Sequence, residues 1–189
     1  MVVNMDLETF AKRLEALEAD RDIRHLISRY AVCCDEHDIA ELCDLFTLDA
    51  VFGSANKSMV ANGREEIRDM FIKTLMTRGP AFHWTHDAVI TVDLKQPDQA
   101  SSVVYAHAET TPNGRVSIAA MKYLDRYQSD GNKWRFSERE IHFLYYIPAT
   151  DFDKGLSQTD RVWIGGQALP ADYPENLKVW QDFEAAYLK

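Results

Sequence analysis

The chain has 189 residues, with 30 acidic and 21 basic side chains and a formal net charge of −9. No basic cluster could follow a phosphate backbone, which argues against nucleic acid as a partner. No apolar run approaches the ~20 residues that span a bilayer, and no secretory leader opens the chain. The three cysteines form no disulfide framework, as expected of reduced thiols. We therefore expect a cytoplasmic protein with no membrane partner.

The N-terminal third has helical periodicity, because its apolar residues recur every three or four positions. The strongest apolar stripe runs from Asp20 to about Glu36 and includes Tyr30. Asp35 falls at the edge of that stripe, at the expected C-terminal end of the helix. The expected elements of this region are helices at 5–19, 20–36, 39–46 and 62–78, and a short strand at 49–53.

From Ala81 the pattern changes from helical to alternating. Turn-forming sequences such as Thr111-Pro112-Asn113-Gly114 separate four long runs. Helices followed by antiparallel strands indicate the α+β class, with the helices on one face of the sheet. Residues 148–189 form a tail with several glycines and prolines and one expected short helix. The four expected strands cover about 82–94, 101–111, 115–128 and 133–146.

His83 and Asp35 are the candidates for acid–base chemistry. A carboxylate that accepts one imidazole N–H fixes the tautomer and leaves the other nitrogen as a base. Strict alternation places His83 opposite to the apolar row of Ala88 and Ile90. Either the pocket wall is the more polar face, or a β-bulge between 84 and 88 reverses the register, which is the hypothesis we favour. The plain alternative is that Asp35 closes a helix and His83 is a core residue.

Four segments of the chain carry a family resemblance: Ile23-Arg24-His25-Leu26-Ile27-Ser28-Arg29-Tyr30-Ala31, Asp49-Ala50-Val51-Phe52, Gly63-Arg64-Glu65-Glu66-Ile67 and Asp130-Gly131-Asn132-Lys133-Trp134-Arg135-Phe136. They resemble the SnoaL-like proteins of the nuclear transport factor 2-like superfamily. The resemblance covers about residues 10–150 and implies a cone-shaped α+β barrel, a strongly curved antiparallel sheet around N-terminal helices with a central pocket. It predicts a domain at 1–150 and an extension at 151–189 that packs on the same or a neighbouring subunit.

The superfamily includes cofactor-independent lyases: scytalone dehydratase, bile-acid 7α-dehydratase and hexachlorocyclohexane dehydrochlorinase. These pair an Asp at a helix end with a His at a strand start, which implies Asp35 and His83 here. The two dehydratases carry a Tyr five residues before the Asp, which implies Tyr30. The resemblance also implies His107 as a second pocket histidine, and His142 or Arg139 in place of an arginine on the last strand. Of the aromatic residues we expect Trp84, Phe52 and Tyr105 to line the pocket.

The resemblance therefore predicts a lyase that acts by dehydratase-like elimination on a hydrophobic cyclic or polycyclic small molecule. The resemblance implies that it needs no cofactor. A metal site is not expected either, because His83, His86 and Asp87 do not supply a closed ligand set. A polyketide cyclase or a ketosteroid-isomerase-like enzyme is an alternative that reuses the pocket. The non-catalytic β-subunit of a ring-hydroxylating dioxygenase is another. We also expect a homo-oligomer, with a trimer favoured and a dimer possible.

Overall fold

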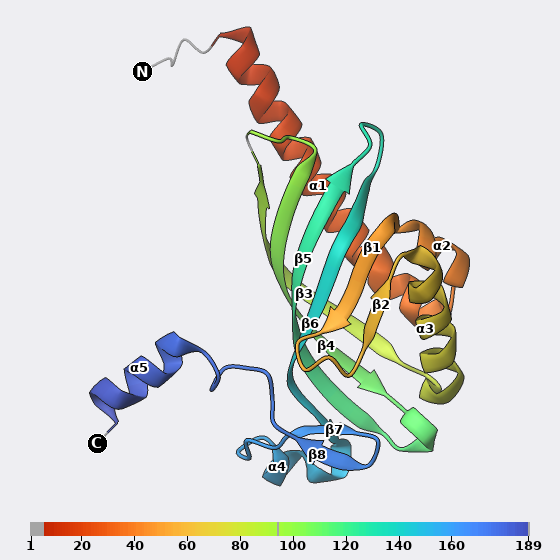
Figure 1. The fold of residues 1–189 in the computed structure, drawn as a ribbon, viewed down its shortest axis with the longest axis vertical. Helices are drawn as coiled ribbons and strands as arrows, with labels where there is room; N and C mark the ends of the chain where they lie inside the picture. The colour runs from red at the N-terminus through yellow and green to blue at the C-terminus, as the bar shows by residue number, and fades with distance from the viewer. Residues whose placement is uncertain (1–5, 94, 189) are drawn as a thin grey trace.

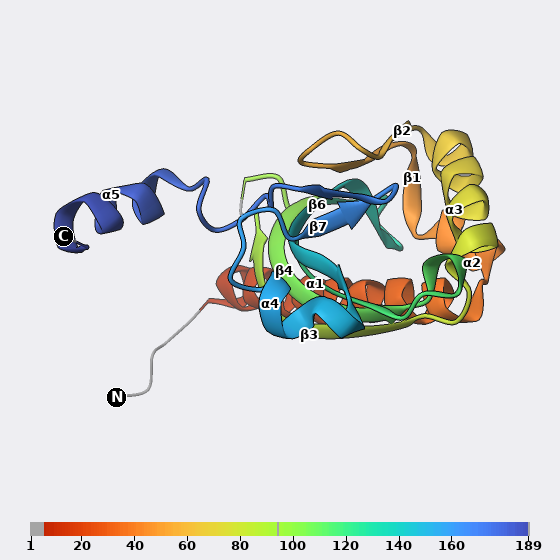
Figure 2. The same cartoon turned by 90° about the horizontal axis from the view of Figure 1, so that it is seen from below.

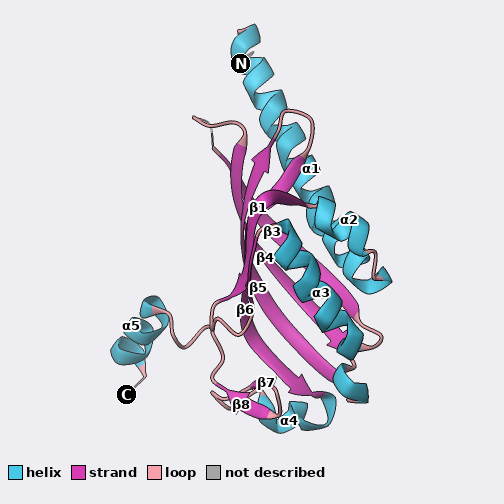
Figure 3. Cartoon of the chain, turned by 45° about the vertical axis from the view of Figure 1, so that its right-hand side comes forward, coloured by secondary structure: helices cyan, strands magenta, loops and turns pink. Residues whose placement is uncertain are grey.

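The fold consists of three N-terminal helices that lie against one side of a curved sheet, as Figure 3 shows. The computed structural model describes residues 6–93 and 95–188. The predicted α+β class, with helices first and long strands after them, is confirmed. The elements are α1 (Leu7–Glu36), α2 (Ile39–Asp44), β1 (Phe46–Ser54), β2 (Val60–Asn62), α3 (Arg64–Arg78), β3 (Phe82–Val92), β4 (Gln99–Thr110), β5 (Ser117–Ser129), β6 (Trp134–Pro148), α4 (Phe152–Gly155), β7 (Val162–Ile164), β8 (Gln167–Leu169) and α5 (Lys178–Tyr187).

Helix α1 is a single helix of 30 residues, not the two segments expected from the sequence. The Asp6 side chain caps its first turn by accepting the Thr9 N–H at 2.7 Å. It ends where His37 adopts a left-handed conformation with φ 58°. The first turns extend past the edge of the sheet (Figure 1), and burial begins at Ala19. No helix within 6–93 or 95–188 is long and apolar enough to cross a membrane.

The sheet has the order β2-β1-β6-β5-β4-β3 and is curved without closing on itself (Figure 2). Strands β3 to β6 form an antiparallel meander, but β1 pairs with β6 in parallel. The sequence did not predict this parallel pair or the short strands β2, β7 and β8. The core fills the space between the concave face of the sheet and the helices, with Tyr30, Phe46 and Phe136 among its buried aromatic residues.

Strand β3 contains the predicted β-bulge. Thr85 is opposite Ala106 and Ala88 is opposite Val104, so three residue steps on β3 face two steps on β4. One extra residue in a strand reverses which face the following side chains occupy. His83 therefore lies on the same face of the sheet as Ala88, which packs against the core.

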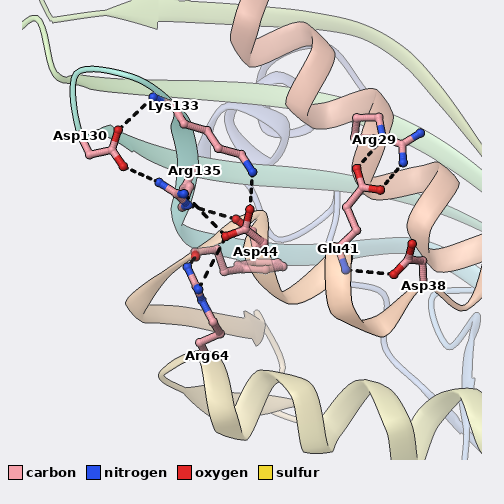
Figure 4. A network of polar contacts seen from close by, with 9 residues as sticks. Arg29, Asp38, Glu41, Asp44, Arg64, Asp130, Lys133 and Arg135 are labelled. Atoms are coloured by element: carbon pink, nitrogen blue, oxygen red, sulfur yellow. Dashed lines mark hydrogen bonds and ion pairs between the residues drawn. The ribbon is translucent and has the colours of Figure 1, made fainter.

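Ion pairs hold the helical layer against the end of the sheet (Figure 4). Asp44, the last residue of α2, pairs with Lys133 and Arg64. Arg29 of α1 pairs with Glu41 of α2, with an Nε to Oε1 distance of 2.8 Å. These contacts join α1, α2, α3 and the start of β6, and so fix the end of α1 from which Asp35 projects.

The C-terminal segment is anchored to the sheet by Arg161. This buried side chain donates to the carbonyls of Leu144 and Tyr173 and pairs with Glu175 at 2.8 Å. Strand β7 begins directly after Arg161 and pairs with β6. Helix α5 lies apart from the rest of the chain (Figure 1), with Phe183 exposed. The predicted homo-oligomer stays a prediction.

Candidate active site

Two hydrogen bonds join Asp35, at the end of α1, to His83, at the start of β3. His83 Nδ1 lies 2.6 Å from Asp35 Oδ1, and the His83 backbone N–H donates to Oδ2 at 3.0 Å. An ionised carboxylate only accepts hydrogen bonds, so the neutral ring carries its proton on Nδ1 and leaves the Nε2 lone pair available. The His83 side chain is 9% exposed and that of Asp35 is 24% exposed.

A cavity of about 180 Å³ lies between the concave face of the sheet and helices α1 and α3. His83 lines it and Asp35 does not, so the imidazole ring stands between the carboxylate and the cavity. Tyr30 and Phe52 also line it, as the sequence predicted. Most of the other lining side chains are apolar: Met59, Met70, Phe71, Ala108, Pro112, Ala119, Met121, Ile141, Phe143 and Ile164.

The two buried phenols of the cavity wall are Tyr30 and Tyr123. Burial raises the pKa of Tyr123 to about 12 and raises the pKa of Tyr30 well above its usual value. Both hydroxyls are therefore proton donors at neutral pH. Burial likewise raises the pKa of the Cys34 thiol, on the same helix as Tyr30, to about 12. The cavity wall thus presents the imidazole of His83 and two protonated phenols.

Arg139 does not line the cavity, because Asp125 holds it behind the aromatic wall. The guanidinium makes two hydrogen bonds to that carboxylate, at 2.9 and 2.8 Å, and both side chains are almost fully buried. Its central carbon lies 4.1 Å from the ring centre of Tyr30 and 4.2 Å from that of Tyr123. Burial acts to lower the pKa of Arg139, but the charge and hydrogen bonds of Asp125 outweigh it and the pKa is raised. Arg139 is a fixed cation beneath the cavity.

Four other residues predicted for the pocket lie on the opposite, convex face of the sheet. Trp84, His107, His142 and Tyr105 are not among the residues lining the cavity. Cross-strand partners share a face, and Trp84 pairs with His107 one position away from the inward-facing His83. Trp84 is 58% exposed. The correction has a simple cause: alternation sends every second side chain outward.

On that convex face the polar side chains pair with one another. Trp84 donates to Glu109 at 2.6 Å, and His86 Nε2 lies 2.5 Å from His107 Nδ1. His142 Nε2 lies 2.5 Å from Glu140. Across 6–93 and 95–188, no group of three or more His, Cys, Asp or Glu side chains is arranged to hold a metal ion.

The sequence reasoning missed several polar groups in the cavity, among them Thr110, Tyr146 and Arg78. Thr110 and Tyr146, from β4 and β6, share a hydrogen bond of 2.9 Å. Arg78, the last residue of α3, lines the cavity as well. Thr110 has the strand parity of Ala108, the partner of His83, so alternation could have identified it. A terminal helix arginine gives no such signal.

The model of the SnoaL-like domain family matches residues 15–140 of the chain. This match includes most of α1, all of α3 and strands β1 to β5, and therefore both Asp35 and His83. A comparison with curated protein sequences finds no match.

Solved structures with the same fold include three with informative names. A hexachlorocyclohexane dehydrochlorinase, LinA-type3 of Novosphingobium barchaimii, has a TM-score of 0.65 at 16% identity, over 72% of this chain and 93% of that one. A candidate scytalone dehydratase of Novosphingobium aromaticivorans has a TM-score of 0.66 at 17% identity, over 86% and 97%. The β-subunit of a candidate aromatic-ring-hydroxylating dioxygenase of the same species has a TM-score of 0.58 at 22% identity, over 68% and 90%. At these identities the likeness concerns the fold.

Proposed function

Because the chain belongs to the SnoaL-like domain family, we propose that it is a cofactor-independent lyase in which His83, oriented by Asp35, removes a proton from a hydrophobic cyclic substrate. The observation that carries the proposal is the two-point contact between Asp35 and a histidine that faces an apolar cavity. Among the described residues, Nε2 of His83 makes no hydrogen bond, so it is available to a ligand.

The proposed reaction is the elimination of water. Nε2 of His83 takes a proton from the carbon next to the one that bears the hydroxyl, and the C–H electron pair becomes the new double bond. The hydroxyl leaves as water after it takes the phenolic proton of Tyr30. The imidazolium proton then returns to the Tyr30 phenolate, which restores both groups. Asp35 stabilises the imidazolium during the step, and such general-base help contributes about 10²–10⁴-fold in rate.

The cavity limits the size of the substrate. Its volume of about 180 Å³ is below the ~300–1,000 Å³ of typical ligand sites. We therefore favour a molecule with one or two rings over a larger polycycle. The aromatic wall of Tyr30, Phe52 and Phe71 suits a flat ring.

The test is a screen of one-ring and two-ring β-hydroxy ketones and β-hydroxy acids, followed by the absorbance of the conjugated product. Wild type is compared with His83→Ala, Asp35→Asn and Tyr30→Phe. Each change should lower kcat by about 10²-fold or more. His142→Ala is the matched control, because that histidine pairs with Glu140 outside the cavity. Turnover that persists in both His83→Ala and Asp35→Asn would contradict the mechanism.

Two alternatives predict different outcomes of the same screen. An isomerase or a cyclase would use the same base but would convert the substrate without releasing water, which the mass of the product reveals. A non-catalytic β-subunit has support in the fold shared with the dioxygenase subunit. That role predicts no turnover at all and co-purification with a larger iron–sulfur subunit.

A further inference from the structure

Arg78 is fixed at the rim of the cavity by the chain around it. It is the last residue of α3, and its carbonyl accepts the Thr111 N–H at 3.2 Å and the Thr111 hydroxyl at 3.0 Å. The same hydroxyl also lies 2.9 Å from the Pro80 carbonyl. Five residues later the chain reaches His83 on β3. The short segment that leads from α3 to β3 therefore has the cation at one end and the proposed base at the other.

The guanidinium of Arg78 has no protein counter-ion in the cavity. None of the described residues that line the cavity is an Asp or a Glu, and Arg78 is the one lining side chain with a permanent positive charge. No carboxylate among the described residues forms an ion pair with it, although Arg64 and Arg68 of the same helix both have carboxylate partners. A half-buried cation without a partner is costly unless a ligand neutralises it.

The charge of Arg78 acts on the interior of the cavity. Burial is the main influence on the pKa of Tyr30 and Tyr123, and Arg78 opposes it on both phenols. The chain as a whole carries a net charge of −9, yet Arg78 places a cation among the residues that line this cavity, and Asp125 already neutralises Arg139 behind the wall. The local field therefore favours an anion where the overall charge would repel one.

We propose that Arg78 binds a carboxylate group of the substrate and so restricts the site to cyclic carboxylic acids. The planar guanidinium can donate two parallel hydrogen bonds to a carboxylate. The ring of the substrate then lies against the apolar wall, with the carbon that loses its proton held toward His83. The inference rests on the proposed function only in taking this cavity as the substrate site.

A purely structural role for Arg78 makes a different prediction. A cation in the last turn of a helix interacts favourably with the helix dipole, and this role would affect folding but not the choice of ligand. A measurement of ligand binding without turnover distinguishes the carboxylate-binding role from the structural role. Matched pairs of a carboxylate and its neutral amide report the charge preference alone.

The experiment is calorimetric titration of wild type with benzoate and benzamide, cinnamate and cinnamamide, and 1-naphthoate and 1-naphthamide at neutral pH. We expect at least one acid to bind about tenfold tighter than its amide, and added salt to reduce that preference. Arg78→Gln should abolish the preference. Arg78→Lys keeps the charge but loses the paired donors, so it should retain only part of it.

One control variant completes the design. Arg68→Gln removes a partly exposed arginine from the same helix and should leave the preference unchanged. Because binding is measured without turnover, a lost lyase activity and a lost carboxylate site are separate results. Equal affinity for acid and amide in wild type, or failure of every acid to bind up to roughly 10 mM, overturns the proposal. A preference that survives in Arg78→Gln overturns it too.

Discussion

The carboxylate of Asp35 accepts both the ring Nδ1–H and the backbone N–H of His83, a residue 48 positions later in the chain. The backbone contact fixes where β3 begins, and the ring contact fixes which nitrogen faces the cavity. A single side chain therefore sets both the position and the tautomer of the proposed base.

Replacing Asp35 by asparagine should separate these two functions. The amide oxygen can still accept one of the two N–H groups but not hold an imidazolium, so the neutral ring should become a mixture of tautomers. Nitrogen-15 NMR of labelled histidine should show Nδ1–H for His83 in wild type and averaged shifts in Asp35→Asn. Asp38→Asn is the control, because that carboxylate caps α2 and does not contact His83. An unchanged His83 spectrum in Asp35→Asn would contradict the assignment.

Gly79 should be intolerant of a side chain. It has φ +64°, and a Cβ there would lie 2.5 Å from Thr111 Oγ1, the atom that holds the end of α3. Gly79→Ala should lower the free energy of unfolding by about 2–3 kcal/mol, from left-handed strain plus this clash. Gly131 has φ +89°, but a Cβ there would meet open space. Gly131→Ala should therefore lower the free energy of unfolding by only about 1 kcal/mol. Urea denaturation measures both, and equal losses would mean that the contact with Thr111 is unimportant.

The β-bulge in β3 could be predicted from the sequence because two parts of the strand indicated opposite faces. His83 had the wrong parity for the apolar row that starts at Ala88, and one inserted residue resolves it. The helix stripe likewise placed Tyr30 on the buried face. Both inferences depend on local periodicity, which a sequence displays directly.

Long-range pairing is what the sequence did not display. His107 and Tyr105 have the parity of the convex face, but parity alone cannot say which face is concave. Arg139 was considered as a pocket residue, and only the pairing of β5 with β6 reveals that Asp125 is opposite to it. Arg78 enters the cavity because the turn after β4 holds the end of α3, a contact between residues 33 positions apart.

The buried pair of Asp125 and Arg139 should be essential to the stability of the cavity wall. Asp125→Asn leaves the arginine charge uncompensated in an interior where its Nη1 already has no hydrogen-bond partner among the described residues. We expect a loss of about 3–5 kcal/mol in the free energy of unfolding. Asp125→Leu combined with Arg139→Met should recover much of it, because the buried charge is then absent.

The control for this pair lies on the same strand and the opposite face. Glu138 pairs with Arg126 at the surface, with side chains 45% and 75% exposed. Glu138→Gln should therefore change the stability by less than about 1 kcal/mol. Thermal and urea unfolding measure all three variants, and a similar small loss in Asp125→Asn would argue against a structural role for the pair.

The histidine pair on the convex face should make the fold sensitive to acid. Desolvation, followed by the charge of His86, lowers the pKa of His107 from its usual 6.5, while Glu109 acts in the opposite direction. The unfolded chain therefore binds this proton more readily than the folded one. The contribution to stability is intact above pH ~6.5 and is lost as the pH falls below that value.

His107→Gln should make the free energy of unfolding less dependent on pH between about 7 and 5. The effect should stay below about 1 kcal/mol, because both rings are largely exposed. His25→Gln is the matched control, because it removes a histidine from the exposed face of α1, outside this pair. Urea unfolding at several pH values gives the slopes. Two imidazoles 2.5 Å apart cannot both be protonated without two N–H donors facing each other, which is the physical reason for the expected acid sensitivity. If His107→Gln keeps the full wild-type slope, the acid sensitivity originates elsewhere.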